Sequence, residues 1–111
     1  FTAKIYSYNG KKILEKKYTK WFDCDKINCE LTVRTRRSGD YMAVSQSGGH
    51  KKLTRCMIND KIPGELRGKL PLVVDGNEVL WIVGGRINER YKITSETGRV
   101  LEITYQGGNV Q

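Results

Sequence analysis

The residues best suited to chemistry lie between Leu31 and Arg55, in the stretch LTVRTRRSGDYMAVSQSGGHKKLTR. Basic side chains gather here around a Ser-Gly-Gly-His sequence that contains His50, the single histidine of the chain. Cationic side chains and glycine-rich backbone can both bind phosphate, because the cations neutralise its charge and glycine lets backbone N–H groups approach it. Three interpretations follow: a nucleotide-binding loop, a surface that lies along a nucleic-acid backbone, or a solvated basic face.

The nucleotide loop is the weakest of the three. A Walker loop needs GxxxxGK[ST] and a dinucleotide loop needs GxGxxG, and neither pattern can be written onto this stretch. The ATP pyrophosphatase loop SGGxDS would need Asp and Ser where Lys51 and Lys52 stand. An ordinary glycine turn explains the Ser-Gly-Gly sequence more simply.

Other catalytic arrangements fit no better. A hydrolase triad would have to use His50 with Ser45 or Ser47, and residues this close in one loop rarely reach triad geometry. Asp23 and Asp25 form a carboxylate pair in a turn, where such residues cap backbone N–H groups more often than they transfer protons. We therefore expect no catalytic residue in this chain.

The three cysteines, Cys24, Cys29 and Cys56, contain no CxxC pair. Neither a disulfide framework nor a zinc site with His50 is indicated, and buried small hydrophobic residues are the simpler interpretation. We expect no metal or cofactor in this chain and a reducing, cytoplasmic location.

Charge is concentrated in one part of the chain. The net charge is +8 over 111 residues, and positions 34 to 69 hold nine basic and three acidic residues, so that the other 75 residues carry only +2. Such a concentration favours an anionic partner, although a solvated face remains an alternative because Lys and Arg commonly point outward. The apolar runs are too short to span a bilayer, and the length predicts a single domain over residues 1–111.

The elements that position the basic residues can be read from periodicity. LTVRTR alternates so that Leu31, Val33 and Thr35 should face inward, with Arg34 and Arg36 on the outer face about 7 Å apart. A short returning strand is expected over 41–44. From Lys51 to about Asp60 the pattern is helical, with Leu53, Cys56 and Met57 forming one apolar stripe and Lys51 and Lys52 at the helix start.

The remaining sequence is mostly β. Asn9-Gly10 and Asp75-Gly76-Asn77 predict hairpins, residues 91–94 and 100–105 read as closing strands, and 106–111 as a loose tail. Pro63 predicts the start of a second short helix that ends before Pro71. The expected fold class is a β-rich α+β fold with two short helices.

Several aromatic residues could stack on unpaired bases. The candidates are Trp21, Tyr41, Trp81 and Tyr91. Trp81, inside VLWIV, is more simply a core residue, so Tyr41, beside the arginines, is the best stacking candidate.

The ordered combination VRTRRSGDY followed by GGHKKLTRCMINDKIPGELRGKLPLVVDGNEVLWIVGGRI resembles the C-terminal domain of bacterial tRNA(Ile)-lysidine synthetase. The resemblance is densest from Phe22 to Ile103. It rests on an Arg-rich strand before Gly39-Asp40, a Lys-Lys-Leu helix start, an Ile-Pro followed by Arg67, and a Leu-Pro-Leu before the hairpin with Trp81. Ser38, Gly64 and Gly68 depart from the family pattern, which puts the orientation of Arg67 in doubt.

The resemblance implies antiparallel sheets in a sandwich-like arrangement, a fold similar to a domain of the phenylalanyl-tRNA synthetase β chain. It also implies a parent ligase, active in tRNA processing, that uses ATP, with magnesium, and lysine to convert the wobble cytidine of isoleucine tRNA to lysidine. That chemistry would lie in an N-terminal ATP-pyrophosphatase domain, which this fragment is expected to lack. The chain begins with Phe1 instead of Met, which suggests a fragment of a longer protein. The expected partners are the tRNA acceptor end and that catalytic domain, with no membrane and with a homodimer left open.

The sequence thus predicts an accessory tRNA-binding domain that is not an enzyme by itself. The expected tRNA-binding residues are Arg34, Arg36, Arg37, Tyr41, Lys51, Lys52 and Arg67. The alternative is a protein-interaction module whose basic face meets an acidic partner or the catalytic domain.

Overall fold

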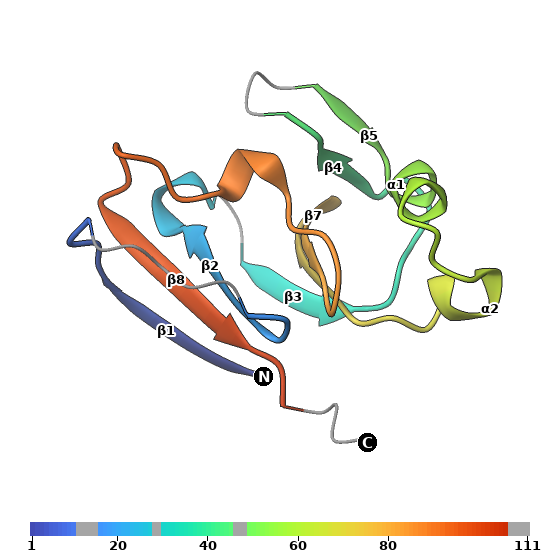
Figure 1. Cartoon of the computed structure of the whole chain (residues 1–111), viewed down its shortest axis with the longest axis horizontal. Coiled ribbons are helices and arrows are strands. Elements are labelled where there is room, and N and C mark those ends of the chain that lie inside the picture. The colour runs from blue at the N-terminus through green and yellow to red at the C-terminus, as the bar shows by residue number, and fades with distance from the viewer. Residues whose placement is uncertain (11–15, 28–29, 46–48, 107–111) are drawn as a thin grey trace. The chain divides into compact units, whose positions relative to one another are not determined.

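The structure, a computed structural model, describes residues 1–10, 16–27, 30–45 and 49–106. The chain forms two compact units, one made of residues 1–27 and 91–111 and the other of residues 28–90 (Figure 1). Each unit is built on its own sheet. The expectation of a single domain over 1–111 stays a prediction, because compactness does not decide whether the units unfold together.

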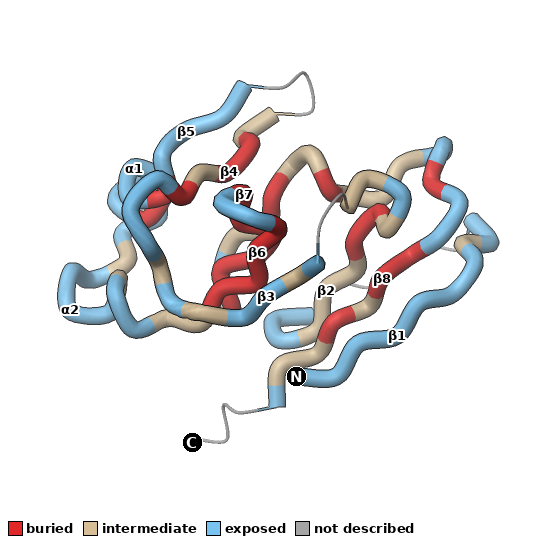
Figure 2. Tube along the Cα trace, turned by 180° about the vertical axis from the view of Figure 1, so that it is seen from behind, coloured by how far each residue is buried: buried red, intermediate tan, exposed pale blue. Residues whose placement is uncertain are grey.

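The first unit contains a three-stranded antiparallel sheet in the order β1-β8-β2. The strands are β1 (Thr2–Ser7), β2 (Thr19–Asp23) and β8 (Arg99–Thr104), and a single 3₁₀ turn, η1 (Cys24–Lys26), follows β2. β8 lies at the centre, between β1 and β2, and its Val100, Leu101 and Ile103 are buried. All six residues of β1 are exposed, as Figure 2 shows.

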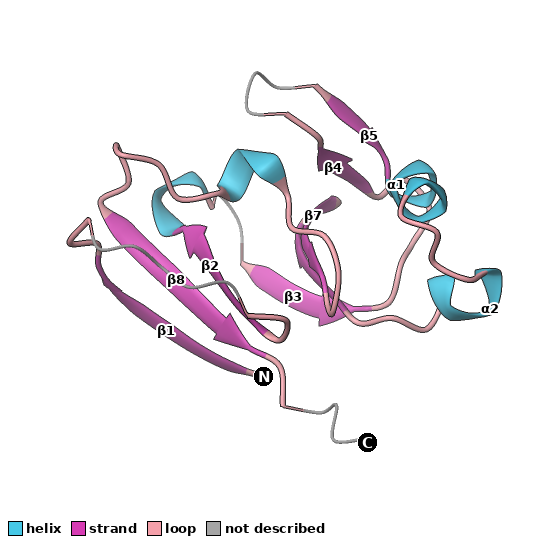
Figure 3. Cartoon of the chain, viewed as in Figure 1, coloured by secondary structure: helices cyan, strands magenta, loops and turns pink. Residues whose placement is uncertain are grey.

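The second unit contains a five-stranded mixed sheet in the order β3-β6-β7-β4-β5. Its strands are β3 (Leu31–Arg34), β4 (Tyr41–Ala43), β5 (His50–Lys52), β6 (Leu72–Asp75) and β7 (Glu78–Ile82) (Figure 3). All neighbouring pairs are antiparallel except β4 and β7. Every residue of β6 and β7 is buried, so these two strands form the interior of the sheet.

The core of the second unit forms between this sheet and α1 (Leu53–Asn59). Leu53, Cys56 and Met57 are buried on one face of α1, as their i, i+3, i+4 spacing predicts. They pack in a cluster with five side chains of the sheet: Met42, Leu72, Val74, Val79 and Ile82. Trp81 is also fully buried, which confirms its expected place in a core.

The end of α1 determines where the chain goes next. The N–H of Lys61 donates to the carbonyl of Ile58, and the N–H of Ile62 donates to that of Met57, both at 3.0 Å. This is a Schellman ending with Lys61 in the left-handed region, at φ 59°. It returns Ile62 to the core before α2 (Gly64–Arg67).

Much of the expected architecture is confirmed. The fold is β-rich with two sheets and two short α-helices, and the hairpin at Gly76 joins β6 to β7. α1 ends at Asn59, close to the expected position. Pro63 lies one residue before α2 and so caps it instead of occupying its first position.

Several local expectations differ from the structure. β3, the edge strand of its sheet, ends at Arg34, and Val33, which was expected to face inward, is 46% exposed. β3 pairs with β6, so β4 does not return beside it. The helical pattern was expected from Lys51, but Lys51 lies in β5, and Lys52 both ends β5 and is the N-cap of α1. Residues 91–94 contain no strand, and Tyr91 instead ends the 3₁₀ turn η2 (Glu89–Tyr91).

Some expectations lie outside the described residues. These are the second arm of the Asn9-Gly10 hairpin at 11–15, Cys29, positions 46–48 of the Ser-Gly-Gly loop, and positions 107–111 of the tail. The described partner of β1 is β8. No helix in the described ranges is long and apolar enough to cross a membrane.

Candidate nucleic-acid interface

Arg34, at the end of β3, faces Asp40. Its Nη1 donates to Asp40 Oδ2 at 2.8 Å, and its Nη2 donates to Oδ1 at 2.7 Å. The Arg34 side chain is 10% exposed and that of Asp40 is 1% exposed. Arg34 also donates to the carbonyls of Thr35 and Gly76. The expectation that Arg34 shares an exposed face with Arg36 is therefore wrong, because the guanidinium is directed to a buried carboxylate.

Both members of this pair are charged at neutral pH. Burial by itself would raise the pKa of Asp40, but hydrogen bonds from Arg34, from the backbone of Arg37 and from Asn77 hold that pKa below its usual value. The hydrogen bonds to Asp40 likewise raise the pKa of Arg34. A buried, bidentate ion pair of this kind fixes the direction of both side chains.

Asp40 connects three segments of the second unit. Its carboxylate accepts the N–H of Arg37 at 2.7 Å and the side-chain amide of Asn77 at 3.3 Å. Its backbone carbonyl accepts the N–H of Leu53 at 2.9 Å, so this first N–H of α1 is already occupied. The Arg37–Asp40 turn, the start of α1 and the β6–β7 turn therefore meet at one residue.

A first hollow, of about 390 Å³, opens beside this turn. Arg36, Arg37 and Lys52 contribute its cations, and Thr54 contributes a hydroxyl. Asp40 is the acidic residue of its lining, and Arg34 already neutralises that carboxylate. The hollow thus presents three cations to a ligand.

A second hollow, of about 700 Å³, lies along α1. Lys51, Lys52 and Arg55 line it together with Thr54, Ile58 and Asn59. Arg55 was not among the expected binding residues, although its position three residues after Lys52 in a helical pattern was the available signal. Tertiary structure was needed to show that both lysines and Arg55 border the same space.

The two hollows share Lys52 and Thr54, and together they form what we call the basic surface. Among the described residues, none of its five cations forms an ion pair with a carboxylate. These cations are Arg36, Arg37, Lys51, Lys52 and Arg55. Unpaired cations around a concave surface are suited to phosphate groups, which supply several acceptor oxygens each.

The remaining candidates for contact with RNA include Tyr41, Arg67 and Tyr91. Tyr41 is half-buried in β4, where its Cα pairs with that of Lys52, and its ring lies 4.9 Å from the His50 ring. Arg67 donates from Nε to the carbonyl of Ile62 at 2.9 Å, which fixes its orientation. Tyr91 is fully buried and is therefore not a base-stacking residue.

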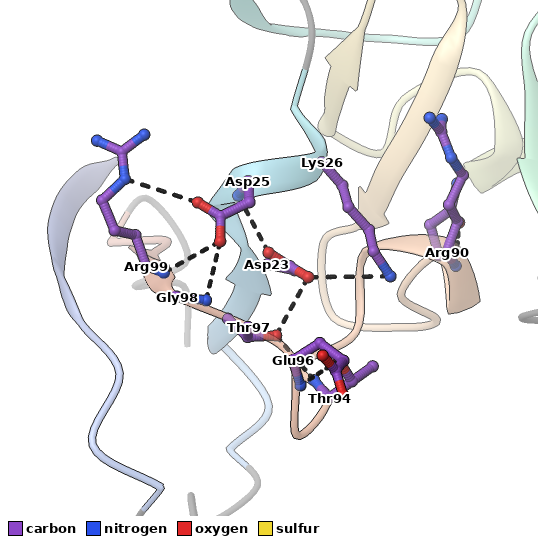
Figure 4. Close-up of polar contacts among 10 residues, drawn as sticks. Asp23, Asp25, Lys26, Arg90, Thr94, Glu96, Thr97, Gly98 and Arg99 are labelled. Atoms are coloured by element: carbon purple, nitrogen blue, oxygen red, sulfur yellow. Dashed lines mark hydrogen bonds and ion pairs between the residues drawn. The ribbon is translucent and has the colours of Figure 1, made fainter.

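The carboxylates of the first unit have a structural role (Figure 4). Asp23 caps η1 by accepting the N–H of Asp25 at 3.0 Å, and it also accepts the hydroxyl of Thr97 at 3.1 Å. Asp25 accepts the N–H of Gly98 at 2.8 Å, and this bond lowers the pKa of Asp25. The expected capping role of these two residues is confirmed.

Metal-ligating side chains do not cluster in the described part of the chain. No group of three or more His, Cys, Asp or Glu residues there is arranged to hold a metal ion. Cys56 is fully buried in the core, as expected for a small hydrophobic residue, and burial raises the pKa of its thiol.

Known proteins share both the sequence and the fold. The family described as the TilS substrate C-terminal domain matches residues 31–103. The chain is 43% identical over 88 residues to a tRNA(Ile)-lysidine synthase of Caldanaerobacter subterraneus, covering 79% of this chain and 19% of that protein. A tRNA(Ile)-lysidine synthase of Clostridium perfringens is 40% identical over 98 residues, covering 88% and 21%.

A solved structure described as the crystal structure of the TILS C-terminal domain superposes with a TM-score of 0.72 and 28% identity. The superposition covers 97% of this chain and 83% of the solved one. The chain spans about a fifth of the length of the curated relatives it matches. The matched residues contain β3 to β7, both helices and the whole basic surface. This chain therefore belongs to the C-terminal domain family of the tRNA(Ile)-lysidine synthases.

Proposed function

We propose that this domain binds tRNA through the basic surface and positions the acceptor end for a tRNA(Ile)-lysidine synthase. The basic surface carries the proposal, since it offers five cations without a paired carboxylate among the described residues. The relatives are named tRNA(Ile)-lysidine synthases, which makes tRNA the anion of choice. The domain itself takes no part in bond making, and it acts in the cytoplasm, where tRNA is modified.

Each cation has a role in this proposal. Arg36 and Arg37 at one end, and Lys51 and Arg55 at the other, contact successive phosphates, with Lys52 between them. Phosphate contacts set the register of a nucleic acid and carry little sequence information. Specificity for isoleucine tRNA then lies in the rest of the enzyme, together with its ATP, magnesium and lysine sites.

Tyr41 and Arg67 are secondary contacts in the proposal. Tyr41 is half-buried and pairs with Lys52 in the sheet, so the residue keeps part of its surface for contact with a base. Arg67 keeps its terminal guanidinium nitrogens for a phosphate while Nε holds the side chain against Ile62.

Titration with isoleucine tRNA at several salt concentrations tests the proposal. About four to six phosphate contacts predict a slope of log affinity against log salt of about −3 to −5. Lys51→Ala together with Lys52→Ala should remove two contacts, reduce the slope by about 1.5 and weaken binding. The matched control is Lys61→Ala together with Lys69→Ala, which removes the same charge from exposed positions outside the hollows.

Equal weakening in the two double variants would show non-specific attraction to net charge and would contradict a defined site. The alternative, an interface for an acidic protein or the catalytic domain, draws on Ile58, which is 50% exposed in the second hollow. Ribonuclease treatment of a pull-down separates the two, because only an RNA partner is lost.

A further inference from the structure

We propose that Arg34 and Asp40 are positioning residues that shape the tRNA-binding surface without touching the RNA. The inference rests on the proposed function, because it takes the basic surface as the binding site. It changes the expected role of Arg34 from a phosphate contact to a support for the cations on either side of it.

The first reason is that the guanidinium of Arg34 already donates its hydrogen bonds within the protein. Two of its nitrogens are within 2.8 Å of the Asp40 carboxylate, and the carbonyls of Thr35 and Gly76 accept further hydrogen bonds from it. Only 10% of its side chain is exposed. A phosphate would have to displace Asp40, and a carboxylate that is 1% exposed would then lose its counter-charge.

The second reason is that Asp40 accepts hydrogen bonds from the two segments that carry the cations. Its carboxylate fixes the N–H of Arg37, which orients the turn that carries Arg36 and Arg37. Its carbonyl fixes the N–H of Leu53, which orients the segment that carries Lys51 and Lys52. One residue thus holds the two cation-bearing segments at the distance that the first hollow requires.

The sharpest test is whether removing the negative charge of Asp40 strengthens or weakens tRNA binding. Asp40→Asn makes the protein more basic by one unit, so a purely electrostatic surface would bind tRNA more tightly. A positioning role predicts weaker binding, because asparagine offers one acceptor oxygen where Asp40 offers two, so it cannot hold both nitrogens of Arg34, the Arg37 N–H and Asn77 together. At physiological salt one phosphate contact is worth about fourfold to fivefold in affinity, so we expect a loss of about fourfold or more.

Asp60→Asn is the matched control. It also adds one positive unit, and it also breaks an arginine pair within the same unit, since Arg86 Nε donates to Asp60 at 2.9 Å. We expect tRNA affinity to be unchanged or slightly higher in this variant. Equal weakening in Asp40→Asn and Asp60→Asn would overturn the proposal, as would unchanged or tighter binding by Asp40→Asn.

A double-mutant cycle shows whether Asp40 acts through the arginines. If it does, Asp40→Asn should change affinity by less than about twofold in a protein that already carries Arg36→Ala and Arg37→Ala. A purely additive loss would overturn the proposal. If the arginine variant bound tRNA as tightly as the unaltered protein, the proposed function itself would fail, which distinguishes the two failures.

The unaltered protein offers a second measurement that does not depend on the folding of any variant. Arginine side-chain N–H signals can be followed by NMR as isoleucine tRNA is added. The signals of Arg36 and Arg37 should shift or broaden, while that of Arg34 stays in place. A shift of Arg34 as large as those of Arg36 and Arg37 would overturn the proposal.

Discussion

The Asp40 carboxylate is nearly inaccessible to solvent and accepts hydrogen bonds from Arg34, Arg37 and Asn77. Its pKa is lowered in the folded state, so the ionised form contributes stability that is fully present above the unfolded pKa of about 3.9. That contribution is lost as the pH falls through the lower folded pKa. Urea unfolding between pH 7 and pH 3 should therefore show the free energy of unfolding decreasing below about pH 5.

Asp40→Asn tests the same residue by mutation. At pH 7 the variant should lose about 3 kcal/mol of unfolding free energy, because Arg34 keeps its charge while its buried partner is gone. Its stability should also fall less steeply with acid than that of the unaltered protein. Parallel pH curves for the two proteins would show that Asp40 is not a source of the acid sensitivity.

Cys56 and Cys24 differ in burial and should differ in reactivity. Cys56 is fully buried with a raised pKa, whereas Cys24 is partly exposed. The thiolate is the reactive form, so iodoacetamide near pH 8 should modify Cys24 in the folded protein and Cys56 only in denaturant. Peptide mapping by mass spectrometry measures both sites, and early modification of Cys56 would contradict its burial.

At the scale of elements, two turns contain a residue in the left-handed backbone region, which suits glycine and strains other residues. One of these positions is occupied by a lysine and the other by a glycine. Lys61, after α1, has φ 59°, and Gly76, in the β6–β7 turn, has φ 68°. A residue with a Cβ is strained there, so Lys61→Gly should stabilise the protein and Gly76→Ala should destabilise it, each by about 0.5–1 kcal/mol. No atom lies within 4 Å of an added Cβ at Gly76, so that loss would come from backbone strain alone.

Lys61→Ala provides the control for this pair, measured by the same urea unfolding. It removes the same ammonium group but keeps a Cβ, so it should bring no gain in stability. A gain equal to that of Lys61→Gly would mean that the charge, and not the backbone conformation, was unfavourable.

The two compact units raise the question of cooperativity for the whole molecule. Trp21 lies in β2 of the first unit and Trp81 in β7 of the second, and the chain contains two tryptophans. In Trp21→Phe the fluorescence therefore reports the second unit alone, while far-UV circular dichroism reports both. A single domain predicts coincident urea transitions by the two probes, and separate midpoints would show two independently unfolding units.

The features that the sequence by itself determined depend on residues that are close together in the chain. The apolar stripe of α1 and the Gly76 turn depend on neighbours a few positions apart, so periodicity and turn preference were enough to predict them. The concentration of basic residues is a direct count from the sequence. The resemblance to a known family supplied the expected family fold and the expected tRNA partner, because the matching residues run through most of the chain.

Only the tertiary structure decided which of the clustered cations are available. Arg34 and Arg36 look equivalent in the sequence, yet Arg34 is enclosed by Asp40 and by the carbonyl of Gly76, 42 positions away. The sequence pattern also did not predict the pairing of β3 with β6 or the burial of Tyr91. Strand partners and buried ion pairs form between segments distant in the chain, and periodicity within one segment carries no information about its partner.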